Sequence, residues 1–200
     1  MTNSQTTSEI LENASIILMQ KAFERSAESF GHFLGKSVAF NSIGKMGESS
    51  ILSLSQLDEP LSMVASEMKG DLKGTCYLIF SRKDARELCA FQLGQAYRKQ
   101  DDLHDALLME LANILTASFV TVLANELNVK TYAHVPKLKK ISRMEMLAIL
   151  KSDEIYLDRS QKFKIHYTIE GIDVQPIFTW AFDANIYSYI TKWMGNKTIS

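Results

Sequence analysis

The longest regular pattern along the chain is a run of residues at helical spacing between Asp101 and Asn128. No glycine or proline lies between Gly94 and Pro136, so nothing in the sequence interrupts a helix there. The spacing predicts one long helix over 101–128, about 42 Å long if it is helical throughout. One stripe of this helix is expected to face a core: Leu107, Leu111, Ile114, Leu115, Ser118, Val122 and Leu123.

A second stripe of the same helix is small at both ends and polar in the middle. Its members are Ala106, Glu110, Asn113, Ala117 and Thr121. Residues three apart share one helical face, so Glu110 and Asn113 present a carboxylate and a carboxamide side by side. Their small neighbours leave the pair projecting from a smooth surface, as entry into another protein's cleft requires. The alternative is an ordinary polar pair on the wet side of an amphipathic helix.

The pattern of helices and strands runs through the chain twice. The first half predicts, in order, a helix from about Ser8 to Leu34 ending at Gly35, strands over 36–40, 61–68 and 74–80, and a helix over 83–93 ending at Gly94. The second predicts the helix over 101–128, a strand over 131–135, a helix over 142–151, strands over 162–168 and 176–182, and a helix over 184–194 ending at Gly195. Two unrelated halves remain an alternative.

Together the two halves predict one α+β domain with a pseudo-two-fold repeat. The strands of both halves would form a shared antiparallel sheet, with the two long helices on one face. The domain is expected over 9–200, with repeat halves 9–95 and 100–200. Residues 1–8 are polar without apolar periodicity, and they are expected to be a disordered N-terminus.

Composition narrows the function classes. The chain has 200 residues, of which 46% are hydrophobic, which is enough to bury one full core. A net charge of −1 gives no electrostatic reason for nucleic-acid or membrane binding. The polar N-terminus does not look like a secretion signal, and no segment approaches the ~20 apolar residues that span a bilayer. Cys76 and Cys89 fit buried small hydrophobes. We therefore expect a cytoplasmic protein.

Other chemistry is not indicated. The four histidines, His32, His104, His134 and His166, show no metal-ligand spacing. There is no glycine-rich phosphate loop and no Gly-x-Ser-x-Gly nucleophile elbow. No metal site and no cofactor are therefore expected. A small basic cluster follows Pro136, and it is interpreted as a solvated edge or as an attraction for a partner's acidic cleft: Lys137, Lys139, Lys140 and Arg143.

The spacing between the pair Glu110 and Asn113 and a later proline makes a chance match less probable. Glu110-x-x-Asn113 alone is a weak signal, but 22 residues separate Asn113 from Pro136, and the chain has only three prolines. Requiring a proline at that offset lowers the chance expectation to roughly one in a hundred. The combination resembles the signature of the CheC / CheX / FliY family of chemotaxis phosphatases. The fuller family pattern has Asp or Ser four residues before the glutamate. Here that position is Ala106, and Asp105 is out of register by one.

The resemblance implies a function and a site. A CheC-like protein would dephosphorylate the aspartyl phosphate of a CheY-like response regulator in chemotaxis or related two-component signalling. Asn113 would orient the attacking water and Glu110 would dock to the regulator, so these two are the expected catalytic residues of a hydrolase. The regulator would supply Mg²⁺, and this chain would bring no cofactor of its own.

Family members with two sites carry the pair in both halves, but the first-half site is predicted to be absent here. Alignment of the two long helices at their ends places Ile16 and Met19 where the first glutamate and asparagine would stand, and Ser42 where the proline would stand. None of these offers a carboxylate or a carboxamide. Ile16, Leu18 and Met19 are expected to pack or to contact a partner.

Three alternatives remain open. The first is a non-catalytic CheC-like binding module that docks a response regulator or a CheD-like deamidase. The second is a flagellar switch component, since FliM and FliY share this domain. The length argues against that second reading, because those proteins carry a further C-terminal module and this chain is expected to end with the last repeat helix. The third is an unrelated α+β domain.

Overall fold

A computed structural model of the chain describes residues 2–45, 60–97, 100–156, 163–174, 176–183 and 185–197. The first half comprises α1 (Thr2–Leu34), β1 (Val38–Lys45), β2 (Leu61–Gly70), β3 (Gly74–Phe80), α3 (Arg82–Leu93) and the 3₁₀ helix η2 (Gln95–Tyr97). The second half comprises α4 (Asp101–Leu127), β4 (Thr131–Ala133), β5 (Lys137–Ile141), α5 (Arg143–Tyr156), β6 (Phe163–Ile169), β7 (Ile177–Phe182) and α6 (Ile186–Lys197).

The strands form one antiparallel sheet in which equivalent strands of the two halves occupy symmetric places about the centre. Within the described residues the sheet has seven strands in the order β1-β6-β7-β3-β2-β4, and β5 also pairs with β2. The central strands β3 and β7 pair with each other, and each is followed outward by its half's other long strand. The outer strand on each side comes from the opposite half. This order confirms the predicted pseudo-two-fold repeat.

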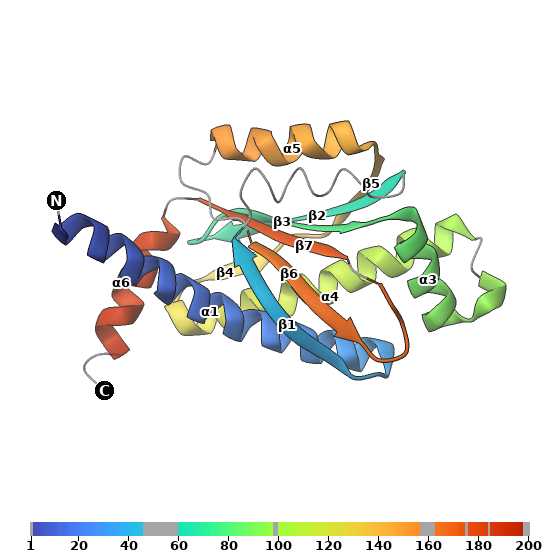
Figure 1. Cartoon of the computed structure of the whole chain (residues 1–200), viewed down its shortest axis with the longest axis horizontal. Helices are drawn as coiled ribbons and strands as arrows, with labels where there is room; N and C mark the ends of the chain where they lie inside the picture. Colours follow the sequence, from blue (N-terminus) through green and yellow to red (C-terminus); the bar gives the residue numbers. More distant parts are fainter. Residues whose placement is uncertain are drawn as a thin grey trace.

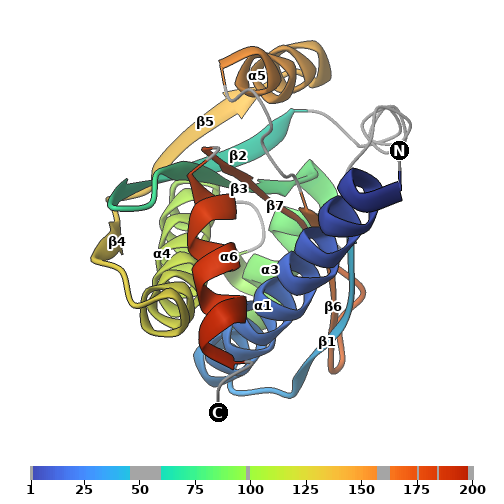
Figure 2. The ribbon, with the colours of Figure 1, turned by 90° about the vertical axis from the view of Figure 1, so that its left-hand side faces the viewer.

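The helices lie in layers on the two faces of the sheet (Figures 1 and 2). The two long helices, α1 and α4, cover one face together with α6. The helix α5 covers part of the other face, above β2, β3 and β5. The predicted fold class, α+β with two long helices on one face of an antiparallel sheet, is confirmed.

The main core lies between the two long helices and the sheet. Phe119 of α4 stacks on Trp180 of β7 with ring centroids 4.0 Å apart, and it meets Phe23 of α1 at 4.5 Å. All three side chains are fully buried. Burying such aromatic residues removes the largest apolar areas of the chain from water and fixes α1, α4 and β7 relative to one another.

The two long helices run antiparallel. Lys21 of α1 forms an ion pair with Glu126 near the end of α4, and Ser118 donates to Ser29 further along α1. Residue numbers thus rise on one helix as they fall on the other. Glu126 also accepts from the indole nitrogen of Trp193 at 3.1 Å, which joins α6 to the same pair.

A smaller core lies on the other face of the sheet, beneath α5. It buries Met146 and Leu150 of α5 against residues of β2, β3, β5 and β7: Leu61, Met63, Tyr77, Ile79, Ile141 and Ile177. The strand β2 is therefore buried on both faces at its start, where its first four residues are all buried.

Three predicted elements differ from the observed ones. The helix α1 begins at Thr2, so the expectation of a disordered segment over 1–8 is wrong in this respect. No glycine or proline precedes Gly31, and the polar N-terminal residues simply continue the helix. The helix α6 runs through Gly195, which was expected to end it, because Ile190 and Trp193 hold the surrounding turns against the core. The strand β5 was not predicted.

The helix α4 is long and apolar enough to span a membrane by length and composition. The expectation that no segment approaches that limit is therefore wrong. Half of the apolar window is buried inside the protein, where it packs against α1 and the sheet. Its apolar character is that of a helix at the centre of a core.

Candidate functional site

The exposed face of α4 carries the predicted pair. The five residues of the second stripe, Ala106, Glu110, Asn113, Ala117 and Thr121, are all exposed. Within the part of the chain that the structure describes, no hydrogen bond or ion pair engages the side chain of Glu110 or Asn113. The pair is therefore presented to solvent with its polar atoms available.

The opposite side of α4 explains why this face points outward. Leu107, Leu111, Leu115 and Leu123 of the predicted core stripe are buried, while Ile114, Ser118 and Val122 are half-buried. The buried face is wider than predicted, since it also includes Leu108, Ala112, Phe119 and Val120. Rotating α4 would expose these apolar side chains to water, so its orientation is fixed by burial.

The C-terminal end of α4 is defined by Asn128. This residue adopts the left-handed conformation with φ of 51°, and its backbone N–H donates to the carbonyl of Ala124. Asparagine tolerates this conformation better than most residues other than glycine. The chain then turns back and enters β4, where the N–H of Lys130 donates to the carboxylate of Asp71 at 2.8 Å.

The ion pair between α4 and β5 allows the positions of Asn113 and Pro136 to be compared along their two segments. Lys140 of β5 forms an ion pair with Asp105 of α4, with 2.5 Å between Nζ and Oδ1. From Asp105 to Asn113 the helix advances about 12 Å at ~1.5 Å per residue. From Lys140 back to Pro136 an extended chain advances about 13 Å at ~3.3 Å per residue. The two advances are similar, so a segment running opposite to α4 from this contact would bring the half-buried Pro136 toward the exposed Asn113.

Asp105 has a structural role. Its carboxylate points to Lys140, whereas Ala106 lies on the face of Glu110 and Asn113. Successive residues of a helix point about 100° apart, so a shift of one position moves a carboxylate from one side of α4 to another. Asp105 anchors α4 to β5 and does not extend the polar pair.

Apolar side chains flank the pair. Met109 precedes Glu110 on α4 and remains 37% exposed, and Val135 precedes Pro136 and is 73% exposed. Exposed apolar residues beside polar ones are typical of surfaces that contact another protein. We define Ala106, Met109, Glu110, Asn113, Ala117 and Val135 as the α4 face.

The equivalent face of α1 lies one residue away from the predicted positions. The helices end at Leu34 and Leu127, each followed by a residue in the left-handed conformation. With these ends aligned, Ile17 corresponds to Glu110 and Gln20 to Asn113. The prediction of Ile16 and Met19 as equivalents is wrong in register, and Ile43 replaces Ser42 opposite Pro136.

Burial supports the corrected register. Met19 and Leu18 are fully buried and Ile16 packs on the core, so the expectation that these three pack is confirmed. Ile17 is 61% exposed and Gln20 is exposed. A carboxamide therefore does stand on this face, contrary to the prediction that the first half offers none. We define Asn13, Ile17, Gln20, Glu24 and Glu28 as the α1 face, all of them exposed.

The carboxamide of the α1 face is already engaged. Gln20 donates from Nε2 to Oε1 of Glu24 at 3.0 Å, one turn along the helix. Further along, Arg25 forms an ion pair with Glu28. At the position of Glu110 this face has an isoleucine. The α1 face therefore has no carboxylate at the position equivalent to Glu110, and the amide of Gln20 is bonded to Glu24 of the same helix.

The buried thiols and the buried phenol are structural. Cys76 and Cys89 are free and buried, as predicted, and burial raises the pKa of both thiols. Burial likewise holds the pKa of Tyr167 well above its usual value. Over the described ranges, no group of three or more His, Cys, Asp or Glu residues is arranged to hold a metal. The shifted thiols and phenol are neutral at physiological pH and offer no nucleophile.

Comparison with known proteins gives a family match for the segment that carries the pair. Residues 103–139 match the CheC-like family. This segment contains Glu110, Asn113 and Pro136. No match is found among curated protein sequences.

Solved structures share the fold. FliY from Thermotoga maritima superposes with a TM-score of 0.63 at 14% identity, covering 88% of this chain and 91% of that one. The FliM middle domain from H. pylori gives 0.58 at 11% identity, with coverages of 91% and 97%. The CheX–CheY–BeF3–Mg²⁺ complex from Borrelia burgdorferi gives 0.54 at 14% identity, with coverages of 82% and 96%. The resemblance to the CheC / CheX / FliY family is thus confirmed: the chain carries a CheC-like segment within the fold of these proteins.

Proposed function

We propose that this protein is a cytoplasmic phosphatase that hydrolyses the aspartyl phosphate of a CheY-like response regulator in chemotaxis or related two-component signalling. One observation carries the proposal: Glu110 and Asn113 project, unengaged by the rest of the described chain, from the smooth exposed face of a helix. The match of residues 103–139 to the CheC-like family adds support. The partner class is suggested by the similar CheX, which was solved with CheY.

The reaction needs an in-line water and neutralised charge on the phosphoryl group. Water attacks phosphorus, the bond between phosphorus and the aspartate oxygen breaks, and the aspartate leaves as a carboxylate. The Asn113 amide oxygen accepts a hydrogen bond from this water and holds a lone pair of the water in line with the breaking bond. Mg²⁺ held by the regulator would neutralise phosphoryl charge, so this chain needs no cofactor of its own.

Glu110 acts in docking. Its exposed carboxylate pairs with a cation beside the phosphorylated aspartate of the regulator, most directly a lysine. A charge-assisted hydrogen bond of this kind fixes the register of α4 in the partner's cleft. Ala106 and Ala117 leave room for the cleft walls to approach, and Met109 and Val135 provide apolar contact.

A binding module is the second candidate. Ala106 offers no carboxylate or hydroxyl at the position where the family pattern has one, so the α4 face has less to bind a regulator with. In this case the protein would dock a response regulator, or a CheD-like deamidase, without hydrolysis.

One experiment separates the two candidates. The decay of aspartyl phosphate is followed on a panel of CheY-like regulators, with wild-type protein, Asn113→Ala and the matched control Gln20→Ala. Faster decay with wild type and the control, and not with Asn113→Ala, supports the phosphatase. Binding of a phosphorylated regulator without any change in its decay would refute the phosphatase and favour the binding module.

A further inference from the structure

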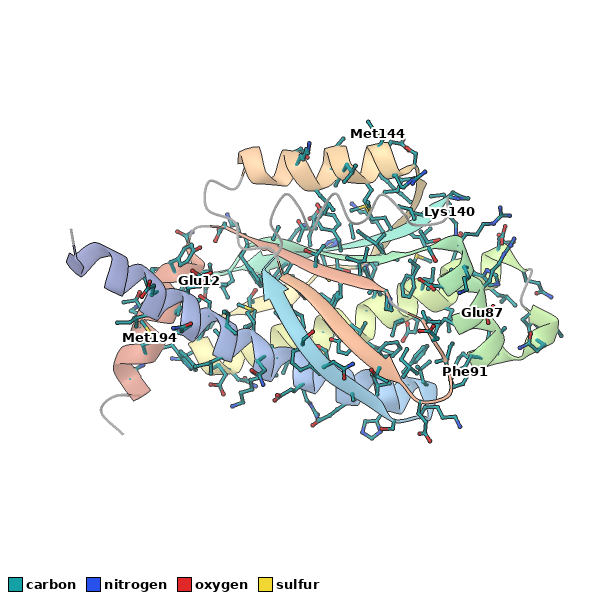
Figure 3. The ribbon with its side chains drawn as sticks, viewed as in Figure 1. Glu12, Glu87, Phe91, Lys140, Met144 and Met194 are labelled. Carbon is teal, nitrogen blue, oxygen red and sulfur yellow. The ribbon has the colours of Figure 1, made fainter. Side chains whose placement is uncertain are left out.

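A basic pocket lies where the first turns of α3 and α4 meet the edge of the sheet. Its volume is about 180 Å³, and it is lined by Pro60, Ser62, Arg82, Ala85, Arg86, Asp101, His104 and Lys140. Three of the lining side chains are cationic and one is a carboxylate. Lys140 lies toward the end of the molecule that carries α3 (Figure 3). This site is separate from the α4 face, since His104 is buried and precedes Glu110 by about 9 Å along the helix.

Arg86 is the first sign of a missing ligand. Its Nε atom is buried, and it has no hydrogen-bond partner among the described residues. A buried donor left without an acceptor is unfavourable, and more so when it belongs to a charged group. The residue as a whole is half-buried, so only this one donor is shut off from water. Guanidinium groups bind carboxylate or phosphate through a planar fork of N–H donors.

Ser62 is the second sign. This side chain is 2% exposed, and its oxygen accepts a hydrogen bond from Nζ of Lys140 at 2.8 Å. The oxygen is thus used as an acceptor, and the hydroxyl hydrogen has no acceptor among the residues described. Arg86 and Ser62 therefore both bring an unused donor to the same pocket, beside the charge of Lys140.

The charge of Lys140 is shared with Asp105, which lies outside the pocket lining, and the carboxylate in the pocket does not pair with Arg82 or Arg86. The side chain of Asp101 is 70% exposed, and its Oδ1 lies 3.7 Å from Nδ1 of His104. The His104 ring is fixed from the other side, where Nε2 donates to the carbonyl of Tyr97 at 3.1 Å. Asp101 can turn to solvent, whereas Ser62 cannot leave the pocket.

From these contacts we infer that the pocket binds a single phosphoryl group, either as inorganic phosphate or as the head of a small phosphomonoester. Phosphate oxygens accept from Nε of Arg86 and from the hydroxyl of Ser62, and Arg82 supplies further positive charge beside Lys140, which also pairs with Asp105. The first turn of α3 adds the favourable end of its helix dipole. The volume is below the range of about 300–1,000 Å³ for sites that enclose a drug-sized ligand, which favours one phosphoryl group over a nucleotide. This inference does not depend on the proposed phosphatase activity.

The test is a titration of the purified full chain by calorimetry and by thermal unfolding. The two probes are inorganic phosphate and glycerol 3-phosphate, each compared with sodium chloride at equal ionic strength. We expect saturable binding and a rise in Tm with at least one phosphate probe and none with chloride. Tighter binding of inorganic phosphate would identify the free anion, and tighter binding of the ester would identify a phosphomonoester.

Two variants locate the binding. Arg86→Gln is expected to weaken phosphate binding about tenfold or more, because it removes both a charge and a paired donor. Lys83→Gln is the matched control, since Lys83 is an exposed cation of the same helix outside this pocket, and it is expected to leave the affinity within about twofold. If Arg86→Gln fails to fold, Ser62→Ala takes its place with the same expectation. Absence of phosphate binding to wild type, or equal losses in Arg86→Gln and Lys83→Gln, would overturn the inference.

Discussion

The faces of α1 and α4 occupy equivalent places in the two halves of one fold, but they differ in what their side chains are free to do. Asn113 is followed one turn later by Ala117, which offers it no partner. Gln20 is followed one turn later by Glu24, which accepts a hydrogen bond from its amide. The same carboxamide chemistry is thus available on α4 and occupied on α1, and neighbouring residues rather than the amide itself make the difference.

A second difference lies in the carboxylate. Glu110 precedes Asn113 by one turn, whereas Ile17 precedes Gln20 and is 61% exposed. An exposed isoleucine cannot pair with a cation, although it can contact an apolar surface. Of these two helix faces, only the α4 face presents a carboxylate and an unengaged carboxamide one turn apart.

The largest expected effect comes from Asn113→Ala. If the amide orients the attacking water, its loss lowers the stimulated dephosphorylation rate by about 100-fold or more, because the reacting atoms lose their alignment. The rate is measured by single-turnover decay of the phosphorylated regulator at saturating protein. Gln20→Ala, the equivalent change on α1, is expected to leave the rate unchanged. Similar losses in the two variants would remove the distinction between the faces.

Glu110→Ala is expected to act mainly on binding. Loss of a charge-assisted hydrogen bond of about 1.5–3 kcal/mol weakens the complex with the regulator by roughly 10- to 100-fold. Fluorescence anisotropy measures the affinity, and the rate at saturation reports catalysis separately. The control is Ile17→Ala on the α1 face. An unchanged affinity together with a rate as low as that of Asn113→Ala would contradict a docking role.

Transplanting the pair tests whether the faces are equivalent in shape. The triple change Ile17→Glu, Gln20→Asn and Glu24→Ala copies the residues of the α4 face onto α1. In the Asn113→Ala background we expect a gain of about tenfold in rate, because the copied side chains recover part of the alignment but the first half has no proline at the position equivalent to Pro136. The same transplant with Gln20→Ala is the control. No gain over that control would mean that the proline side of the site is required.

The smallest effect is expected from the anchor of α4. Asp105→Asn removes the ion pair with Lys140, in which the two side chains are 31% and 39% exposed. Partial exposure screens the pair, so we expect a loss of about 1 kcal/mol in the free energy of unfolding and a fall of roughly 2–4 °C in Tm. Asp102→Asn, an exposed neighbour, is the control for charge. Equal stability of the two variants would show that the pair is not an anchor.

The sequence predicted the exposed stripe of α4 more accurately than the residues around it. Helical spacing alone placed Glu110 and Asn113 on one exposed face, because the apolar side of α4 leaves only one orientation. It could not reveal the hydrogen bond of Gln20 to Glu24, and a register error of one residue hid Gln20 altogether. Since consecutive residues point about 100° apart, such an error exchanges an exposed face for a buried one.

The strand β5 is an element that the hydrophobic periodicity of the sequence does not predict. Its sequence, Lys-Leu-Lys-Lys-Ile, reads as a basic edge, and the cluster was interpreted as solvated or as an attraction for a partner. In the structure Lys137 and Lys139 are exposed, whereas Lys140, 39% exposed, also contacts Ser62 and Asp105. Only the pairing of β5 with β2 reveals this, and pairing between distant strands leaves little trace in a single sequence.

The order of strands in the sheet has a consequence for how the protein folds. Each half places its outer strand beside the other half, since β1 pairs with β6 and both β4 and β5 pair with β2. Neither half can therefore satisfy its own hydrogen bonds, and pairing must wait until chain segments far apart in sequence have met, which slows folding. A break in the backbone between Tyr97 and Gln100 should yield two fragments that are each unstructured alone and that regain the sheet only when mixed. The smallest cooperative unit is then the whole domain and not the repeat.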